Sequence, residues 1–181
     1  MRSRSGTSRG NREPSSRGQA GYSLIELLVV IAIIGIVSLV TVPNFMSMYQ
    51  SSRLKSSVRQ FTSDLRGARQ RAVTQYQWVK VDVDPASSPA RYEISVSTDL
   101  GTTWSTPVVR EVLEPITIDS VTNRVDGPDA NLLPEIIFRN NGTVVTVADG
   151  LSPGVTFKTP AKVGQPTIAV RISPMGNITA N

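Results

Sequence analysis

Residues 24–42 read LIELLVVIAIIGIVSLVTV, and only Glu26, Ser38 and Thr41 among them are polar. As an α-helix this run would be about 28 Å long at 1.5 Å per residue, which matches the hydrocarbon core of a bilayer. We therefore expect a membrane-spanning helix over residues 24–42. It is longer than the apolar segment of a typical secretory signal peptide, and no small-x-small cleavage site follows it, so we disfavour a cleaved signal; an uncut signal anchor remains an alternative.

A basic leader precedes this run. Residues 1–21 contain five Arg and one Glu and, apart from Met1, no aliphatic side chain larger than Ala, so they lack the apolar surface needed to fold. The overall formal charge of +5 and the pI near 10.0 come mostly from this segment. Cations on this flank indicate that the amino end stays in the cytoplasm and the rest of the chain lies outside.

The residue types that are missing exclude several kinds of chemistry. The chain has no His and no Cys, so a histidine base, a thiol nucleophile, a His or Cys metal site and a disulfide are all excluded. It also lacks a G-x-S-x-G nucleophile motif and a phosphate-binding loop. We expect no enzyme and no cofactor. Asp126, Asp129 and Asn131 offer oxygen ligands for calcium, but we interpret them as turn residues and expect no metal site.

Beyond residue 42 the apolar residues continue at helical spacing, but on one side only. This apolar stripe comprises Leu54, Val58, Phe61, Leu65, Ala68 and Ala72. Cations lie mostly off the stripe: Arg53, Lys55, Arg59, Arg66, Arg69 and Arg71. We interpret them as a solvated face, with anionic lipid and nucleic acid as the alternatives.

The two patterns together predict one N-terminal helix over residues 22–77, ending near Gln75. Its membrane-spanning part is 24–42 and its amphipathic part is 43–77. Gly35 and Pro43 lower helix propensity by about 1 and 3 kcal/mol relative to Ala, so we expect local melting or a kink there.

The pattern changes to short β-branched runs at residue 78. Strands are predicted at Trp78–Val83, Tyr92–Ser97, Val108–Leu113, Ile116–Val121, Glu135–Arg139, Thr143–Val147 and Thr167–Ile172. Turn residues such as Asp84-Pro85 and Asn140-Asn141-Gly142 separate them, which favours antiparallel hairpins. We expect an α+β fold in which this β-rich head, residues 78–181, packs one sheet face on the apolar stripe. The expected aromatic core residues are Trp78, Trp104, Phe138 and Phe157.

The junction of leader and helix, Gly21-Tyr22-Ser23-Leu24-Ile25-Glu26, resembles the processing signature of type IV prepilins and type II secretion pseudopilins. The resemblance implies that a prepilin peptidase cuts after Gly21 and methylates the new amino group of Tyr22. The mature chain would then be residues 22–181, anchored in the bacterial inner membrane with its head in the periplasm.

The position of Glu26 also has a physical explanation that does not depend on the resemblance. A carboxylate in an apolar helix costs about 2.5–3.5 kcal/mol at the bilayer centre and less toward the interface. The amino group of Tyr22, from the same chain or from a neighbouring subunit, would neutralise it, and pairing between neighbours would fix their register. The alternative is that Glu26 has no partner: its side chain reaches the membrane interface by snorkelling, and the N-terminal helix dipole stabilises its charge.

Two later blocks resemble the strand-glycine-strand segments of the GspH/FimT family of minor pilins and pseudopilins. They are residues 136–144, IIFRNNGTV, and residues 170–178, VRISPMGNI. Some members of that family bind DNA through a terminal glycine-arginine-x-arginine element. Here Gly176 is followed by Asn177-Ile178-Thr179 without arginine, so we do not expect nucleic acid as a partner by that route.

These patterns predict a non-enzymatic minor subunit of a type IV pilus or a type II secretion pseudopilus. The partners implied by the resemblance are the prepilin peptidase, other major and minor pilins or pseudopilins, an assembly ATPase and a platform membrane protein. Membrane lipid surrounds residues 24–42 before assembly. The alternative is a binding module displayed at a tip, either an adhesin or a DNA receptor, anchored by the same helix.

Overall fold

The structure is a computed structural model that describes residues 22–122, 133–145, 153–159 and 166–181. It divides into two units, Met1–Val42 and Pro43–Asn181.

One long helix, α1, spans Leu24–Gln75, so the predicted helix and its predicted end are confirmed. The Ser23 carbonyl accepts the first bonds, from the backbone N–H groups of Glu26 at 3.0 Å and Leu27 at 3.2 Å. At the other end Tyr76 takes the left-handed conformation, with φ of 57°. The Gln77 N–H then donates to the Ala72 carbonyl at 3.1 Å, a bond that closes a helix and turns the chain.

The first unit contributes the apolar part of α1. Every large apolar side chain from Leu24 to Leu39 is at least 49% exposed, on all sides of the helix. Within the part of the chain that the structure describes, no helix meets the length and apolarity expected of a membrane span. The span predicted for residues 24–42 therefore stays a prediction.

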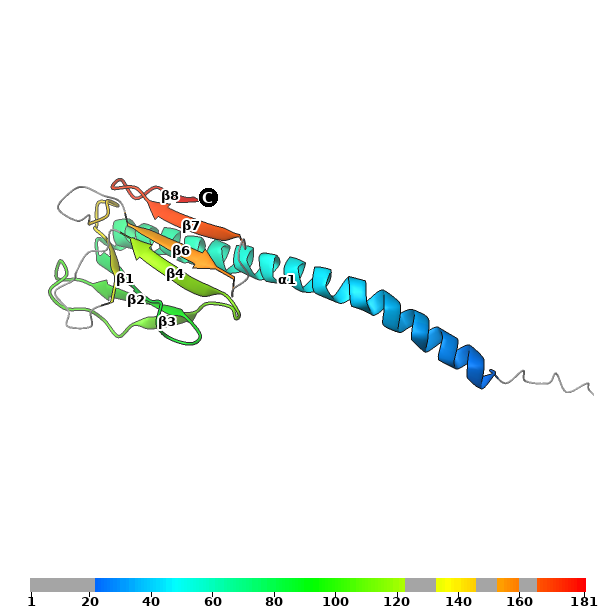
Figure 1. Cartoon of the computed structure of the whole chain (residues 1–181). Helices are drawn as coiled ribbons and strands as arrows, with labels where there is room; N and C mark the ends of the chain where they lie inside the picture. The colour runs from blue at the N-terminus through cyan, green and yellow to red at the C-terminus, as the bar shows by residue number, and fades with distance from the viewer. Residues whose placement is uncertain (1–21, 123–132, 146–152, 160–165) are drawn as a thin grey trace, which may run out of the picture. The chain divides into compact units, whose positions relative to one another are not determined.

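Among the described residues of the second unit there are eight strands in two antiparallel sheets (Figure 1). The first sheet has the order β3-β2-β1-β5, with β1 at Trp78–Asp84, β2 at Arg91–Ser97, β3 at Val108–Glu111 and β5 at Glu135–Phe138. The second has the order β4-β6-β7-β8, with β4 at Thr117–Thr122, β6 at Gly154–Lys158, β7 at Thr167–Ile172 and β8 at Ile178–Ala180. The predicted α+β class with antiparallel pairing is confirmed.

Six of the predicted strands are present, with small shifts at their ends. The run predicted at Thr143–Val147 forms only an isolated bridge between Phe138 and Val144, and its last two residues lie outside the described ones. Strands β6 and β8 were not predicted. Strand β6 alternates apolar Val155 and Phe157 with polar Thr156 and Lys158, a signal that sequence reasoning overlooked, whereas β8 has only three residues, too few for a periodic signal.

The apolar stripe of α1 is the centre of the head. All six of its side chains are buried, none more than 5% exposed. Phe61 touches both sheets: its ring lies edge-on to Tyr92 of β2 at 4.9 Å and to Phe157 of β6 at 5.2 Å between centroids. The predicted packing of the head on this stripe is confirmed, and it involves two sheets rather than one.

A polar contact joins α1 to the first sheet beside this core. The Tyr92 hydroxyl donates to Asp64 Oδ2 at 2.6 Å, and Arg110 Nε lies 3.9 Å from the same oxygen. Burial, together with the hydrogen bond to Asp64, raises the pKa of Tyr92 well above its usual value. The hydroxyl therefore stays protonated and keeps its bond to the helix at neutral pH.

The aromatic prediction is right for Phe138 and Phe157, which are fully buried, and wrong for Trp78 and Trp104, which are only half-buried. The two indoles pack beside Gly101 in the turn after β2. A Cβ added at Gly101 would lie 3.0 Å from Trp78 and 3.6 Å from Trp104. They therefore cover a surface turn instead of filling the space under the helix.

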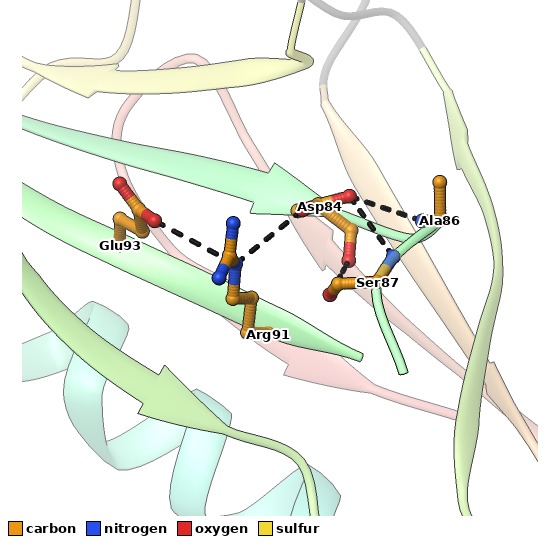
Figure 2. A network of polar contacts seen from close by, with 5 residues as sticks. All are labelled: Asp84, Ala86, Ser87, Arg91 and Glu93. Atoms are coloured by element: carbon orange, nitrogen blue, oxygen red, sulfur yellow. Dashed lines mark hydrogen bonds and ion pairs between the residues drawn. The ribbon is translucent and has the colours of Figure 1, made fainter. Parts of the chain in front are cut away.

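The turn between β1 and β2 shows the turn chemistry predicted at Asp84-Pro85 (Figure 2). The Asp84 carboxylate accepts from the N–H groups of Ala86 at 3.1 Å and Ser87 at 3.2 Å. Arg91 Nε lies between Asp84 Oδ2 at 3.4 Å and Glu93 Oε1 at 3.7 Å. These contacts set where the chain reverses and so fix the register of β1 against β2.

Phe61→Ala should destabilise the head by about 3–5 kcal/mol, because it removes the ring that both sheets pack on. Urea unfolding of the detergent-solubilised full-length protein, followed by the fluorescence of Trp78 and Trp104, measures the change. Ser63→Ala, at an exposed position of the same helix, should stay within about 0.5 kcal/mol of the parent. Equal unfolding free energies for the two variants would contradict the central role of Phe61.

Candidate assembly and processing site

The structure describes the helical side of the predicted processing junction. Gly21 lies outside the described residues. Tyr22 is 86% exposed and Glu26 is exposed one turn into the helix. Together with Leu27 and Val30 they line a cleft of about 160 Å³. The backbone nitrogen that cleavage would turn into an amino terminus therefore belongs to a residue that shares a cleft with the Glu26 carboxylate.

No ion pair of Glu26 occurs within the described residues of the chain. Its place in the first turn of α1 favours an acid, and the sequence Ser23-x-x-Glu26 fits a helix-capping pattern. The helix dipole is worth about 0.3–1 kcal/mol, whereas a carboxylate in the middle of a bilayer costs about 2.5–3.5 kcal/mol. In a fully apolar environment the helix dipole would therefore offset only part of the cost of burying the carboxylate, and a nearby cation could offset the rest.

The few other polar groups of the apolar segment are satisfied within the helix. The Ser38 hydroxyl donates to the Ile34 carbonyl at 2.7 Å, and the Thr41 hydroxyl donates to the Val37 carbonyl at 2.9 Å. Neither side chain therefore needs water as a partner, which suits an environment of lipid or other helices.

Gly35 and Pro43 both lie within α1, which runs through both residues. A Cβ added at Gly35 would meet nothing within 4 Å, so no close packing in this chain requires a glycine there. The predicted melting or kink at Gly35 and Pro43 stays a prediction.

The two blocks that resemble GspH/FimT proteins meet at one side chain, Arg69. Its Nε donates to the Gly142 carbonyl at 3.1 Å, and its Nη2 donates to the Met175 carbonyl at 2.9 Å. Both turns use glycine in the left-handed region, with φ of 80° at Gly142 and 76° at Gly176. Arg69 thus fixes both glycine turns to α1, although the two turns lie far apart in the sequence.

The cations of α1 therefore differ in role, and the prediction of one solvated face needs correction. Arg69 binds two turns, and Arg53 donates to the Glu114 carbonyl at 2.6 Å. Four others are exposed: Lys55, Arg59, Arg66 and Arg71. Sequence reasoning missed the two structural arginines because their acceptors are backbone carbonyls of distant turns, which leave no local pattern.

Sequence reasoning also missed a buried cluster of charged side chains in the first sheet. Lys80 Nζ lies 3.3 Å from Asp82 Oδ2 and 3.5 Å from Glu135 Oε1, and it sits 4.9 Å from the centre of the Trp104 ring. All three charged side chains are at most 6% exposed. The alternation Lys80-Val81-Asp82 in β1 is typical of a solvated sheet face, and only the tertiary structure shows that this face is covered.

The three residues considered as calcium ligands, Asp126, Asp129 and Asn131, lie outside the described residues. Within the ranges that the structure covers, no group of three or more His, Cys, Asp or Glu side chains is arranged to hold a metal ion.

Comparison with known proteins supports the interpretation of both units. A family described as the prokaryotic N-terminal methylation motif matches residues 16–42. No curated protein matches the sequence significantly.

Several solved structures resemble the fold, among them the following two. One is the type IV minor pilin FimU of Pseudomonas aeruginosa, with a TM-score of 0.53 and 16% identity over 74% of this chain and 92% of that one. The other is the minor pseudopilin EpsH from the Type 2 Secretion System of Vibrio cholerae, with a TM-score of 0.50 and 12% identity over 71% of this chain and 96% of that one. The chain therefore combines a prokaryotic methylation motif with a pilin-like fold, as the resemblance predicted.

Gly176→Ala should destabilise the head by about 1–3 kcal/mol, because the new Cβ would lie 2.4 Å from the Gly142 carbonyl oxygen at a left-handed φ. Gly67→Ala is the matched control: its Cβ would meet nothing within 4 Å, and removing a helical glycine should stabilise by about 0.5–1 kcal/mol. Urea unfolding of the full-length protein compares the two. Shifts of the same sign would refute the assigned role of the two turns.

Proposed function

We propose that this chain is a structural subunit of a type IV pilus or a type II secretion pseudopilus, not an enzyme. A prepilin peptidase removes residues 1–21 on the cytoplasmic side and methylates the amino group of Tyr22. Residues 24–42 anchor the mature chain in the bacterial inner membrane, with the head in the periplasm, until it is assembled.

The observation that carries this proposal is the contrast between the two parts of α1. At Leu24–Leu39 the large apolar side chains are exposed on every side, whereas the stripe from Leu54 to Ala72 is buried under the sheets. A helix that is apolar all round needs an apolar surrounding along its whole circumference. Lipid provides it before assembly, and the helices of neighbouring subunits provide it afterwards.

The exchange between these two surroundings costs little, because lipid tails and apolar side chains solvate the helix similarly. What distinguishes the assembled state is Glu26. Its carboxylate can meet the amino group of a neighbour's Tyr22, which neutralises both charges and sets the stagger between subunits. The match of residues 16–42 to the methylation motif supports this role for Tyr22, since the methylated amine keeps its positive charge.

The partners follow from this scheme. The subunit needs a peptidase for maturation, other major and minor pilins or pseudopilins as neighbours, and lipid as its first surrounding. Extraction from the membrane requires energy, which we assign to an assembly ATPase acting through a platform membrane protein.

Replacing Gly21 by Leu should leave the precursor uncut, because the peptidase must accommodate the residue before the scissile bond. The readout is the electrophoretic mobility of the protein in bacterial cells that also produce a prepilin peptidase. Gly18→Leu, three residues upstream in the leader, is the matched control and should be processed normally. A Gly21→Leu protein that matures like the control would refute the assigned cleavage point.

Glu26→Ala should be inserted and cut as in the parent but enter filaments at least about tenfold less, since a loss above 1.4 kcal/mol corresponds to a factor of ten. The measurement is the ratio of filament-associated to membrane-associated protein after shearing. Glu111→Ala, which removes an exposed carboxylate from the head, should leave that ratio unchanged. Normal incorporation of Glu26→Ala into filaments would contradict the proposed pairing of Glu26 with Tyr22 of a neighbouring subunit.

A further inference from the structure

Three exposed cations of α1 share one side of the helix. Lys55, Arg59 and Arg66 are four and seven residues apart, spacings that return to the same face, and they cover about 16 Å of helix length. We call these three side chains the basic face. Within the described residues, none of them has a hydrogen bond or an ion pair.

The basic face is not compensated from its own helix. Positions three and four residues from each cation hold no acid, and Lys55 and Arg59 are like charges at a spacing that destabilises a helix by about 0.2–0.5 kcal/mol. The acid of the amphipathic part of this helix, Asp64, lies on the other flank with Tyr92 and Arg110. The chain therefore carries a small electrostatic cost that its own fold does not relieve.

A recess adjoins the basic face at Arg66. It has a volume of about 540 Å³ and lies between α1, through Arg66, Arg69, Gln70 and Val73, and the turn at Gly176, Asn177 and Ile178. Arg69 forms a fixed wall because its guanidinium is bound to two carbonyls. Arg66 lines the recess with no such bond, so its guanidinium is available to a group that enters.

We propose that the basic face and this recess receive a carboxylate-bearing segment of a different subunit in the same filament, with one carboxylate against Arg66. This inference rests on the proposed function. A guanidinium beside an open recess with an apolar edge at Val73 and Ile178 suits an acidic side chain on a folded protein surface.

Two other occupants fit less well. Nucleic acid favours longer cationic tracts with aromatic side chains for stacking, whereas the described residues that line the recess include no aromatic side chain and the chain after residue 21 is nearly neutral. A second copy of this chain offers Glu111 and Glu114, but Glu111 lies opposite Arg91 across the β2–β3 ladder and Glu114 sits where Arg53 docks. Glu111 thus has a cation opposite it in its own sheet, and the backbone carbonyl of Glu114 is held against α1 by Arg53, so we favour a different subunit over a second copy.

The first test compares Arg66→Glu with Arg71→Glu, a matched exposed arginine on the other side of the same helix. Both full-length variants should be cut and methylated like the parent. Arg66→Glu should enter sheared filaments at least about tenfold less than the parent, and Arg71→Glu should enter normally. Equal incorporation of the two variants would overturn the inference. A parent protein that is processed but absent from filaments would instead overturn the proposed function itself.

The second test identifies the occupant. A zero-length carbodiimide crosslinker applied to filaments joins the Lys55 amine to a touching carboxylate, and mass spectrometry of the linked peptides names that residue. The expected partner of Lys55 is an Asp or Glu of another subunit, and changing it to Lys should restore the incorporation of a Lys55→Glu variant. Links only to this chain's own carboxylates would overturn the inference, as would DNA binding at physiological salt that Arg66→Glu abolishes.

Discussion

The head depends on the contact between the apolar stripe of α1 and two sheets at once. Phe61 touches Tyr92 in one sheet and Phe157 in the other, so neither sheet has a core without the helix. Arg69 and Asp64 add polar contacts on either side of the stripe, one to the glycine turns and one to β2. The same helix that we propose as anchor is thus also the scaffold of the head.

One helix with two kinds of surface explains how such a subunit can change its surroundings. From Leu54 to Ala72 the helix is committed to its own sheets, because its apolar side is buried there. Before that point its apolar side chains are exposed and its inner hydroxyls are satisfied by the helix itself. In the proposed function, assembly can therefore replace lipid by neighbouring helices around residues 24–42 while the buried stripe of the head stays in place.

Much of this could be predicted from the sequence, because local patterns encode it. Helical spacing predicted α1 and its buried side, and β-branched runs with turn residues predicted six strands. Patterns could not predict β8, which is very short, or the half-exposed positions of Trp78 and Trp104, which come together only where the turn at Gly101 brings them side by side. They also could not separate Arg69, bound to carbonyls of residues 142 and 175, from Arg66, which has no partner among the described residues.

The supposition beneath the proposed function is that proteolysis creates an amine beside an acid placed at the start of an apolar helix. Mass spectrometry of the N-terminal peptide, taken from the protein in membranes of its native cells, tests this most directly. The expected peptide begins at Tyr22 and carries a methyl group on its amino nitrogen. A peptide that still begins at Met1, or a mature chain that starts downstream of Val42, would contradict it.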